Sequence, residues 1–262
     1  MATAIHLEGL RKDFPTPSGG RYTSVQNVTL NVEAGKFLCL VGPSGCGKST
    51  ILNMVAGLLE PTGGAISISG ERLAGLNRRA GYMFQQDALL PWKTVLENVT
   101  LGLTFRGIAR KEAEDRGRTW LARVGLEGFA ASYPYQLSGG MRKRAAMVQS
   151  WIVNPDLLLM DEPFSSLDIH TRQKMEDELL QLWTDSHTTV LFVTHDLEEA
   201  IALSDRVLLF KAGPRAALKA DYPVGLPRPR NVAEARFIPG FTELYRTVWS
   251  SLKEEVMAAY AR

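Results

Sequence analysis

The chain has 262 residues, of which 45% are hydrophobic and 22% are charged, a composition typical of folded globular proteins that argues against intrinsic disorder. Its 30 basic and 28 acidic residues leave a formal charge of +2, so no large basic excess points to a nucleic acid partner. The length allows one large domain or two small ones.

The cysteines, histidines and apolar runs exclude several further classes of protein. The two cysteines, Cys39 and Cys46, and the four scattered histidines lack the spacing of a disulfide framework or a zinc site. No run approaches the roughly 20 apolar residues that cross a bilayer, and the N-terminal segment does not resemble a secretory signal. We therefore expect a soluble, cytoplasmic protein that is not integral to a membrane.

The first third of the chain favours short strands. Apolar and polar residues alternate at 5–7, 28–32 and 66–68, a pattern typical of half-buried strands. The segment PTPSGG at 15–20 is rich in turn-forming residues. These segments predict antiparallel β structure near the N-terminus.

A continuous apolar run at 37–41 predicts a strand that is covered on both faces. The next segment, Gly42–Thr50, fits the pattern G-x-x-x-x-G-K-[ST], and helical spacing continues over 49–59. Glycines let the backbone wrap closely around a phosphate chain, and the helix N-terminus adds the positive end of its dipole. Lys48 would hold the β- and γ-phosphates and the Ser49 hydroxyl would ligate Mg²⁺. We therefore predict a nucleotide-binding loop.

The segment from about 88 to 150 changes to a helix-favouring composition. Its charged stretch at 110–118 mixes both signs, which favours a solvated helix face. Further on, Leu137–Met141 reads Leu-Ser-Gly-Gly-Met before an apolar helical stretch. Two interpretations are open: a flexible loop in which Ser138 caps a helix, or a second helix N-terminus that binds a phosphate.

An apolar run at Leu157–Met160 ends in two carboxylates, Asp161 and Glu162. A carboxylate at the end of such a strand suits the role of holding Mg²⁺ in P-loop ATPases. Glu162 stands where it could orient and deprotonate a water for attack on a γ-phosphate. The alternative is a strand that merely ends in polar residues, and the loop at 42–50 favours the chemical interpretation.

The remaining core segments alternate between strand and helix. Apolar runs at 190–193 and 207–210 are separated by helical patterns at 171–185 and 196–203, which implies a largely parallel sheet. We therefore predict an α/β fold.

The composition changes again after Gly213. The segment GLPRPRN at 225–231 predicts an extended linker. Apolar residues then recur at helical spacing and form one stripe of an amphipathic helix: Phe241, Leu244, Tyr245, Val248, Trp249, Leu252 and Val256. We favour packing of this stripe on its own domain over contact with a partner.

Together these motifs resemble those of the ATPase subunits of ABC transporters, over residues 5 to 211. Six segments match the family's motifs in the family's order, which makes coincidence negligible. They resemble, in turn, Walker A at Gly42–Thr50, the Q-loop at Gln85, the LSGGQ signature at Leu137–Met141, Walker B with its catalytic glutamate at Leu157–Glu162, the D-loop at Ser165–Asp168 and the switch histidine at His195.

The resemblance implies a fold and a domain organisation. The fold would be a P-loop NTPase (RecA-like) core with an N-terminal antiparallel β subdomain and an inserted helical subdomain. An ABC ATPase domain would span 1–211, with the helical insertion at about 88–150. Residues 212–262 would form a C-terminal extension with the linker and the amphipathic helix.

The resemblance also assigns roles to the site residues, with ATP and Mg²⁺ as cofactors. The catalytic residues would be Glu162, His195, Lys48 and Gln85, and the Mg²⁺ ligands would be Ser49, Gln85 and Asp161. Phe14 matches the aromatic residue that stacks on adenine, an ordinary core residue being the alternative. The other ATP-binding residues of this subunit would be Gln85 and those of the loop: Gly42, Pro43, Ser44, Gly45, Cys46, Gly47, Lys48, Ser49 and Thr50.

In this family ATP lies between the Walker A loop of one subunit and the signature of another. Carried over, Ser138, Gly139 and Gly140 would bind the γ-phosphate of the ATP held by the opposite subunit. Two departures stand out: Met141 replaces the usual glutamine of the signature, and the helix at 145–151 lacks the common Arg-Ala-Leu ending. Neither touches a catalytic residue, and we expect an active ATPase.

The segment Gln85–Val99 corresponds to the family's contact surface for the membrane subunit. Within it Leu90-Pro91-Trp92, and in the tail Leu226–Arg230, resemble importers of the nitrate, sulfonate and taurine group. Trp92 could anchor a partner helix or pack locally in the core.

These features lead to the expectation of a peripheral ATPase at the cytoplasmic face of the inner membrane. It would drive uptake of a small anion or organic solute through a separate permease, with a periplasmic solute-binding protein and without nucleic acid. One set of half-sites implies a second ATPase subunit, either a second copy or a sister chain. The alternatives are a soluble P-loop kinase or nucleotide switch, and an ABC-type mechanical protein acting on DNA or ribosomes.

Overall fold

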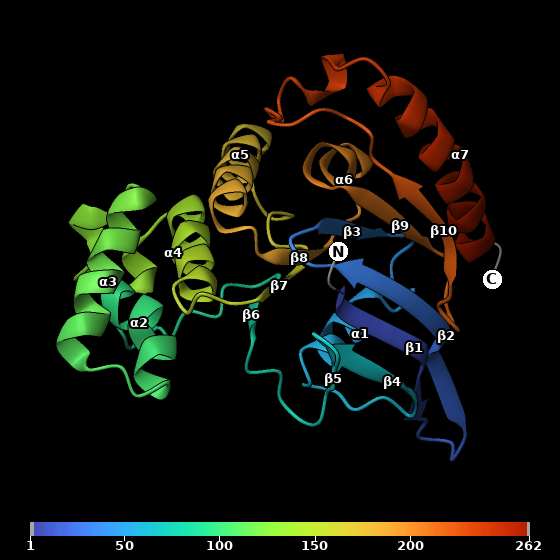
Figure 1. The fold of residues 1–262 in the computed structure, drawn as a ribbon, viewed down its shortest axis with the longest axis horizontal. Coiled ribbons are helices and arrows are strands. Elements are labelled where there is room, and N and C mark those ends of the chain that lie inside the picture. Colours follow the sequence, from blue (N-terminus) through green and yellow to red (C-terminus); the bar gives the residue numbers. More distant parts are fainter. Residues whose placement is uncertain (1–2, 261–262) are drawn as a thin grey trace.

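The computed structural model describes residues 3–260, which form two β-sheets with helices packed between and around them (Figure 1). The smaller sheet is antiparallel and has the strand order β2-β1-β4-β5. Its strands are β1 (Thr3–Pro15), β2 (Arg21–Glu33), β4 (Gly63–Ile68) and β5 (Glu71–Arg72). In β2 the side chains of Val28, Leu30 and Val32 are buried while their neighbours are exposed, as the alternation in the sequence predicts.

The larger sheet has six strands in the order β10-β9-β3-β8-β7-β6. Five of them are parallel, and β10 pairs antiparallel with β9 at one edge. The strands are β3 (Phe37–Val41), β6 (Ala80–Met83), β7 (Leu157–Asp161), β8 (Thr189–Val193), β9 (Arg206–Phe210) and β10 (Leu218–Pro223). The sheet confirms the predicted α/β fold.

Strand β3 is buried on both faces, because its side chains alternate between two hydrophobic cores. Residues 37, 39 and 41 pack with the helices α5 (Ile169–Ser186) and α6 (Leu197–Leu203). Residues 38 and 40 pack with the helix α1 (Lys48–Val55) and the antiparallel sheet. This two-sided burial explains why the strand is apolar at every position.

Helix α1 ends earlier than the sequence predicts, at Val55 instead of residue 59. The backbone N–H of Gly57 donates to the carbonyl of Met54, and that of Leu58 donates to Asn53, which is the Schellman pattern of a helix end. Gly57 has φ +71°, and a Cβ there would lie 1.9 Å from the carbonyl oxygen of Gly75. A glycine at this position therefore stops the helix.

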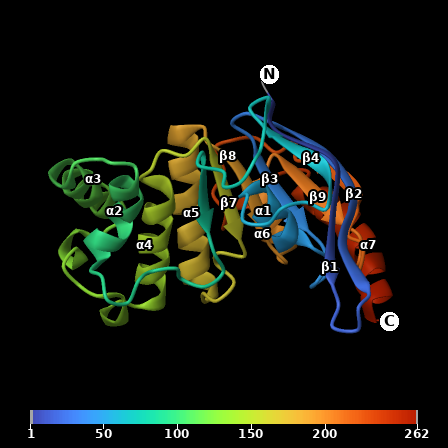
Figure 2. The same ribbon diagram turned by 90° about the horizontal axis from the view of Figure 1, so that it is seen from below.

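Three helices form a group on one side of the molecule, beyond the β6 edge of the larger sheet (Figures 1 and 2). They are α2 (Val95–Phe105), α3 (Arg110–Arg123) and α4 (Gly139–Trp151), and two short 3₁₀ turns, η1 (Glu127–Phe129) and η2 (Pro134–Gln136), lie between α3 and α4. The charged stretch at 110–118 forms the exposed face of α3, where Arg110 pairs with Glu114 at 2.7 Å. The tight pairing of Arg116 with Glu112 repeats this spacing of four residues.

The C-terminal tail packs on the parallel sheet and its helices through the short turn η3 (Ala235–Phe237) and the helix α7 (Phe241–Tyr260). Helix α7 buries Phe241, Val248 and Leu252 in the same core as α6, whereas Trp249 is 45% exposed. The apolar stripe therefore packs on its own domain, as favoured above.

The segment 225–231 has neither helix nor strand, but two arginines anchor it. The guanidinium of Arg230, which is 8% exposed, donates to the carbonyls of Ile201, Ala202 and Ser204 at the end of α6. Arg228 pairs with Asp205 at 2.8 Å. The extended segment is therefore bound to the core along its length. Within residues 3–260, no helix is both long and apolar enough to span a membrane.

Candidate active site

The predicted site residues follow neighbouring strands of one parallel sheet. The strands β3, β8, β7 and β6 lie side by side, and their carboxyl ends meet at one edge. These ends carry, in the same order, the loop Gly42–Thr50, His195, the pair Asp161 and Glu162, and Gln85. Asp161 is itself the last residue of β7. Ligands of open α/β sheets bind at this edge, so the topology itself gathers most of the predicted site.

The backbone of the loop favours glycine at Gly42, Gly45 and Gly47, all of which have positive φ. A Cβ on Gly42 would lie 2.9 Å from the sulfur of Cys46 and 3.0 Å from the carbonyl oxygen of Phe210. Gly47 precedes α1 with φ +94°, a left-handed conformation that side chains rarely adopt. Helix α1 begins directly after this glycine, and the first N–H groups of a helix, which have no partner within it, suit a phosphate chain.

Lys48 brings a positive charge into this loop. Its side chain is buried, and Nζ donates to the carbonyls of Gly42 at 2.8 Å and Pro43 at 3.0 Å. Nζ also lies 3.6 Å from the sulfur of Cys46. Burial raises the pKa of the Cys46 thiol, so that it stays protonated beside the ammonium. The lysine is the one charged group of the loop and suits an anion.

Ser49 and Asp161 form the candidate magnesium site. The Ser49 hydroxyl donates to Oδ1 of Asp161 at 2.9 Å, joining the start of α1 to the end of β7. Burial raises the pKa of Asp161. A hydroxyl and a carboxylate oxygen that converge beside a phosphate-binding loop fit the hard, oxygen-ligated character of Mg²⁺. Gln85 lies at the same sheet edge, but among residues 3–260 no hydrogen bond joins its side chain to either residue.

Glu162 and His195 come together across β7 and β8. The Nδ1 atom of His195 lies 3.1 Å from Oε2 of Glu162. Glu162 has φ +43°, a strained conformation for a non-glycine residue, and its backbone N–H donates to the carbonyl of Val193 at 3.0 Å. Its own carbonyl accepts from the Ser165 hydroxyl at 3.0 Å. These bonds hold the strained backbone of Glu162 in place, with its carboxylate against the histidine, as expected of a residue placed for chemistry.

The signature segment lies elsewhere. Ser138 caps α4 by accepting a hydrogen bond from the Met141 N–H at 3.3 Å, and a Cβ on Gly140 would lie 3.0 Å from Thr171 on α5. Within residues 3–260, no hydrogen bond or ion pair joins this segment to the loop at 42–50. Met141 is partly buried and packs against the core, so the residue that departs from the family pattern anchors the helix through apolar contact.

Phe14 lies on β1, opposite Tyr22 on β2. Its ring is half-buried, and the ammonium of Lys12 lies 5.3 Å from the ring centroid. The ring is therefore not part of the fully buried core, and its stacking on adenine stays a prediction.

Two groups of residues near the site escape sequence reasoning. Asp87 and Lys143 pair at 3.1 Å beside Gln85, although 55 other residues separate them along the chain. The only sequence signal for the pair is an acidic residue two positions after Gln85.

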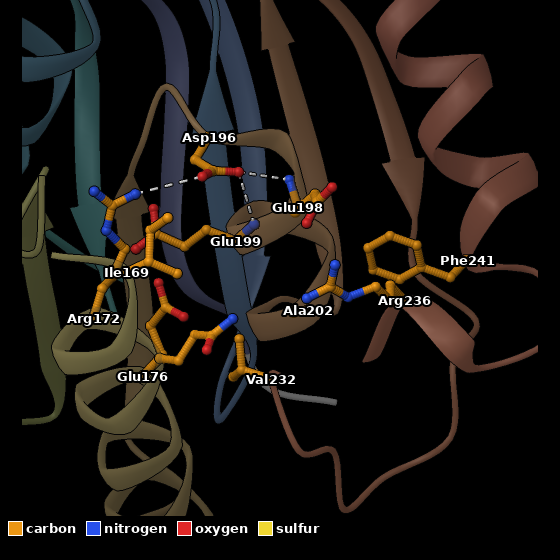
Figure 3. Close-up of a pocket in the computed structure, with 11 residues that line it drawn as sticks. Ile169, Arg172, Glu176, Asp196, Glu198, Glu199, Ala202, Val232, Arg236 and Phe241 are labelled. Atoms are coloured by element: carbon orange, nitrogen blue, oxygen red, sulfur yellow. Dashed lines mark hydrogen bonds and ion pairs between the residues drawn. The ribbon is translucent and has the colours of Figure 1, made fainter. Parts of the chain in front are cut away.

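The second group lines a pocket between α5, α6 and the tail (Figure 3). Here the carboxyls of Glu176 and Glu199 meet, and burial raises the pKa of both, that of Glu176 to about 7. The charge of Glu176 raises the pKa of Glu199 further, whereas the hydrogen bond with Glu199 lowers that of Glu176. Glu199 also accepts a short hydrogen bond from Thr194, the residue before His195. No local pattern in the sequence distinguishes these two residues from ordinary helix glutamates.

Comparison with known proteins identifies the family. The model of the family described as ABC transporter matches residues 25–165. The chain is 41% identical over 257 residues to MJ0412 of Methanocaldococcus jannaschii, called an uncharacterized ABC transporter ATP-binding protein, covering 98% of this chain and 94% of that one.

Two other relatives have named cargoes. A bicarbonate transport ATP-binding protein, CmpD of Synechocystis, is 40% identical to this chain. The match covers 87% of this chain and 81% of that protein. A nitrate import ATP-binding protein, NrtC of Synechococcus elongatus, is 35% identical, and the match covers 97% of this chain but 39% of that protein.

Solved structures share the fold. A dimeric structure of MJ0796, described as a bacterial ABC transporter cassette, matches with a TM-score of 0.75 and 33% identity, covering 84% of this chain and 98% of that one. A second structure of MJ0796, in a post-hydrolysis state with ADP and Pi, matches over the same shares with a TM-score of 0.74 and 31% identity. The chain therefore belongs to the ABC transporter family, as an ATP-binding subunit that hydrolyses ATP.

Proposed function

We propose that the chain powers the import of a small anion, of the nitrate or bicarbonate kind, through a separate permease. The names of CmpD and NrtC support an anion as cargo, and the resemblance of Leu90-Pro91-Trp92 and Leu226–Arg230 to importers of nitrate, sulfonate and taurine extends the class to organic anions. The protein would act at the cytoplasmic face of the inner membrane, with a solute-binding protein on the other side supplying the cargo.

The site residues divide the hydrolysis among them. The loop Gly42–Thr50 and Lys48 bind the phosphates of ATP, and Phe14 stacks on adenine. Ser49, Asp161 and Gln85 would hold Mg²⁺, which would supply positive charge to offset that of the β- and γ-phosphates. Glu162 orients and deprotonates the attacking water, and His195, 3.1 Å away, fixes the carboxylate and reaches the γ-phosphate.

The separation of the signature from the loop supports a two-subunit site. Ser138, Gly139 and Gly140 form a helix start suited to an anion, and within residues 3–260 no hydrogen bond or ion pair joins it to the loop at 42–50. In a dimer of the kind seen for MJ0796, each signature would close the ATP site of the facing subunit. The second subunit is either another copy of this chain or a sister ATPase.

The observation that supports a permease partner most directly is the exposure of Trp92. Its side chain is 70% exposed, which argues against the alternative of local core packing. The buried amide of Asn98 holds the segment rigid: it accepts from the N–H of Leu90 at 2.7 Å and donates to the carbonyls of Leu90, Lys93 and Thr94. A large aromatic side chain on a rigid, exposed loop is suited to act as an anchor residue in a protein interface.

Co-purification tests this proposal. A tagged chain is co-expressed with a permease of the nitrate or bicarbonate importer type, and the retained permease and its stimulation of ATP hydrolysis are measured. Trp92→Ala should lose most of the permease, whereas Trp249→Ala, an equally large truncation of a half-exposed residue on α7, should not. Full retention of the permease by Trp92→Ala would contradict the proposal that Trp92 lies at the permease contact. Full function without any membrane partner would favour the alternative of a soluble kinase or nucleotide switch.

A further inference from the structure

A buried lysine connects Gln85 with the helix that begins at the signature. Lys143 lies in the second turn of α4, and its side chain is 3% exposed. Its Nζ atom donates to the backbone carbonyl of Gln85 at 2.6 Å and pairs with Oδ1 of Asp87 at 3.1 Å. One ammonium therefore binds the segment around Gln85 through a hydrogen bond and an ion pair.

The neighbouring residue continues the connection to the signature itself. Nε of Arg142 pairs with Oδ2 of Asp87 at 3.2 Å, and its Nη1 donates to the carbonyl of Leu137 at 2.8 Å. An unbroken chain of polar contacts thus runs from the backbone of Gln85 to the first residue of the signature. Ser165 and Ser166, which follow Glu162, line the same hollow.

The energetics of burial make this connection stiff. A buried ammonium that loses its partners carries a large desolvation cost, so Lys143 strongly disfavours any state in which Gln85 leaves α4. Charge-assisted hydrogen bonds are also shorter and stronger than neutral ones. Movement of the Gln85 segment should therefore carry the start of α4 with it.

We propose that Lys143 is a positioning residue: it holds the backbone of Gln85 for hydrolysis and makes the Gln85 segment and the signature move as one body. The proposal rests on the role of Gln85 given under the proposed function. Through Arg142 and Asp87, a displacement at Gln85 reaches Leu137, and so the ATP site of the facing subunit. Lys143 itself touches neither ATP nor the attacking water.

The test is a double-mutant cycle on the ATPase activity of the purified chain, with Lys143→Met, Gln85→Ala and the double variant. Because a small misplacement of a reacting group costs up to about a hundredfold in rate, Lys143→Met should lower kcat by roughly ten- to a hundredfold with little change in KM for ATP. In the Gln85→Ala background, Lys143→Met should cause no further loss. Lys111→Met, a charge removal on the exposed face of α3, serves as the matched control and should leave kcat unchanged.

The outcomes distinguish a failure of the role of Lys143 from a failure of the role of Gln85. If Gln85→Ala lowers kcat and Lys143→Met lowers it further by the same factor in that background, Lys143 acts elsewhere and the inference is overturned, while the role of Gln85 stands. If Gln85→Ala leaves kcat unchanged, the proposed role of Gln85 fails and the inference fails with it. Should Lys143→Met not fold, Lys143→Gln, which keeps an N–H donor without the charge, takes its place in the same cycle.

Discussion

His195 and Glu162 lie 3.1 Å apart although they follow two different strands, β8 and β7. The contact exists because these strands are parallel neighbours, so that their carboxyl ends open onto the same edge. The hydrogen bonds of Glu162 to Val193 and Ser165 hold its strained backbone in place. The pair is thus set by the sheet and does not depend on a mobile loop.

The first prediction concerns Glu162. Glu162→Gln keeps the shape of the side chain but removes the base, so kcat for ATP should fall by about 10²- to 10⁴-fold while ATP still binds. Steady-state hydrolysis and equilibrium binding of a fluorescent ATP analogue measure the two effects. Glu127→Gln, on the exposed turn η1, is the matched control and should hydrolyse ATP normally. Near-normal turnover by Glu162→Gln would remove Glu162 from the mechanism.

A second prediction follows from the carboxyl pair in the pocket of Figure 3. Burial raises the pKa of Glu176 from 4.5 to about 7, and the pKa of Glu199 is raised as well, with Arg172, Asp177 and Asp196 also facing Glu176. The folded state therefore binds more protons than the unfolded state between these values, and the free energy of unfolding falls as pH rises through this window.

The slope is the measurable quantity, at most about 1.4 kcal/mol per pH unit for each proton. Urea unfolding at several pH values between about 5 and 7 should show this decline in the wild type and a flatter profile in Glu176→Gln. Glu198→Gln, an exposed change in the same pocket, should keep the wild-type slope. An unchanged slope in Glu176→Gln would contradict the raised pKa of Glu176.

The third prediction tests the end of α1. Gly57→Ala would place a Cβ 1.9 Å from the Gly75 carbonyl oxygen at a left-handed φ, so it should lower the free energy of unfolding by roughly 2–4 kcal/mol. Gly128→Ala, whose Cβ would meet no atom within 4 Å, should be close to neutral. Chemical denaturation of both variants compares them directly, and equal stabilities would contradict the close approach of Gly57 to Gly75.

The fourth prediction concerns the anchored tail. Arg230→Leu removes the donors of the carbonyls of Ile201, Ala202 and Ser204, and each buried acceptor that loses its partner costs about 1–3 kcal/mol. The thermal midpoint should therefore fall by several degrees. Arg236→Leu, an exposed arginine of the same tail, should change it little. A wild-type midpoint for Arg230→Leu would mean that the tail contributes nothing to the stability of the domain.

The parts of the molecule that the sequence predicts well are those with a local cause. The loop Gly42–Thr50 can be recognised because its glycines and its lysine are required within nine consecutive residues, and the strand at 37–41 because both of its faces are buried. Asp161 and Glu162 are recognisable as carboxylates at the end of a buried strand.

The parts that sequence reasoning misses depend on contacts between distant segments. The ion pair of Asp87 with Lys143 and the contact of Glu176 with Glu199 require the packing of α4 near Gln85 and of α5 near α6. The early end of α1 depends on the close approach of Gly75 to Gly57, which helical periodicity does not report. The anchoring of 225–231 depends on the carbonyls at the end of α6 that accept hydrogen bonds from Arg230, and this arrangement exists only in the folded chain.

We propose that Lys48 and Ser138 act in one ATP site but on different subunits. Lys48→Ala and Ser138→Arg should each be inactive alone, since each homodimer has both of its sites damaged. After the two variants are mixed, a mixed dimer has one site with an intact loop and an intact signature. Hydrolysis should therefore return to about a quarter of the wild-type rate, because half of the dimers are mixed and half of their sites are intact. No recovery on mixing would contradict the shared site.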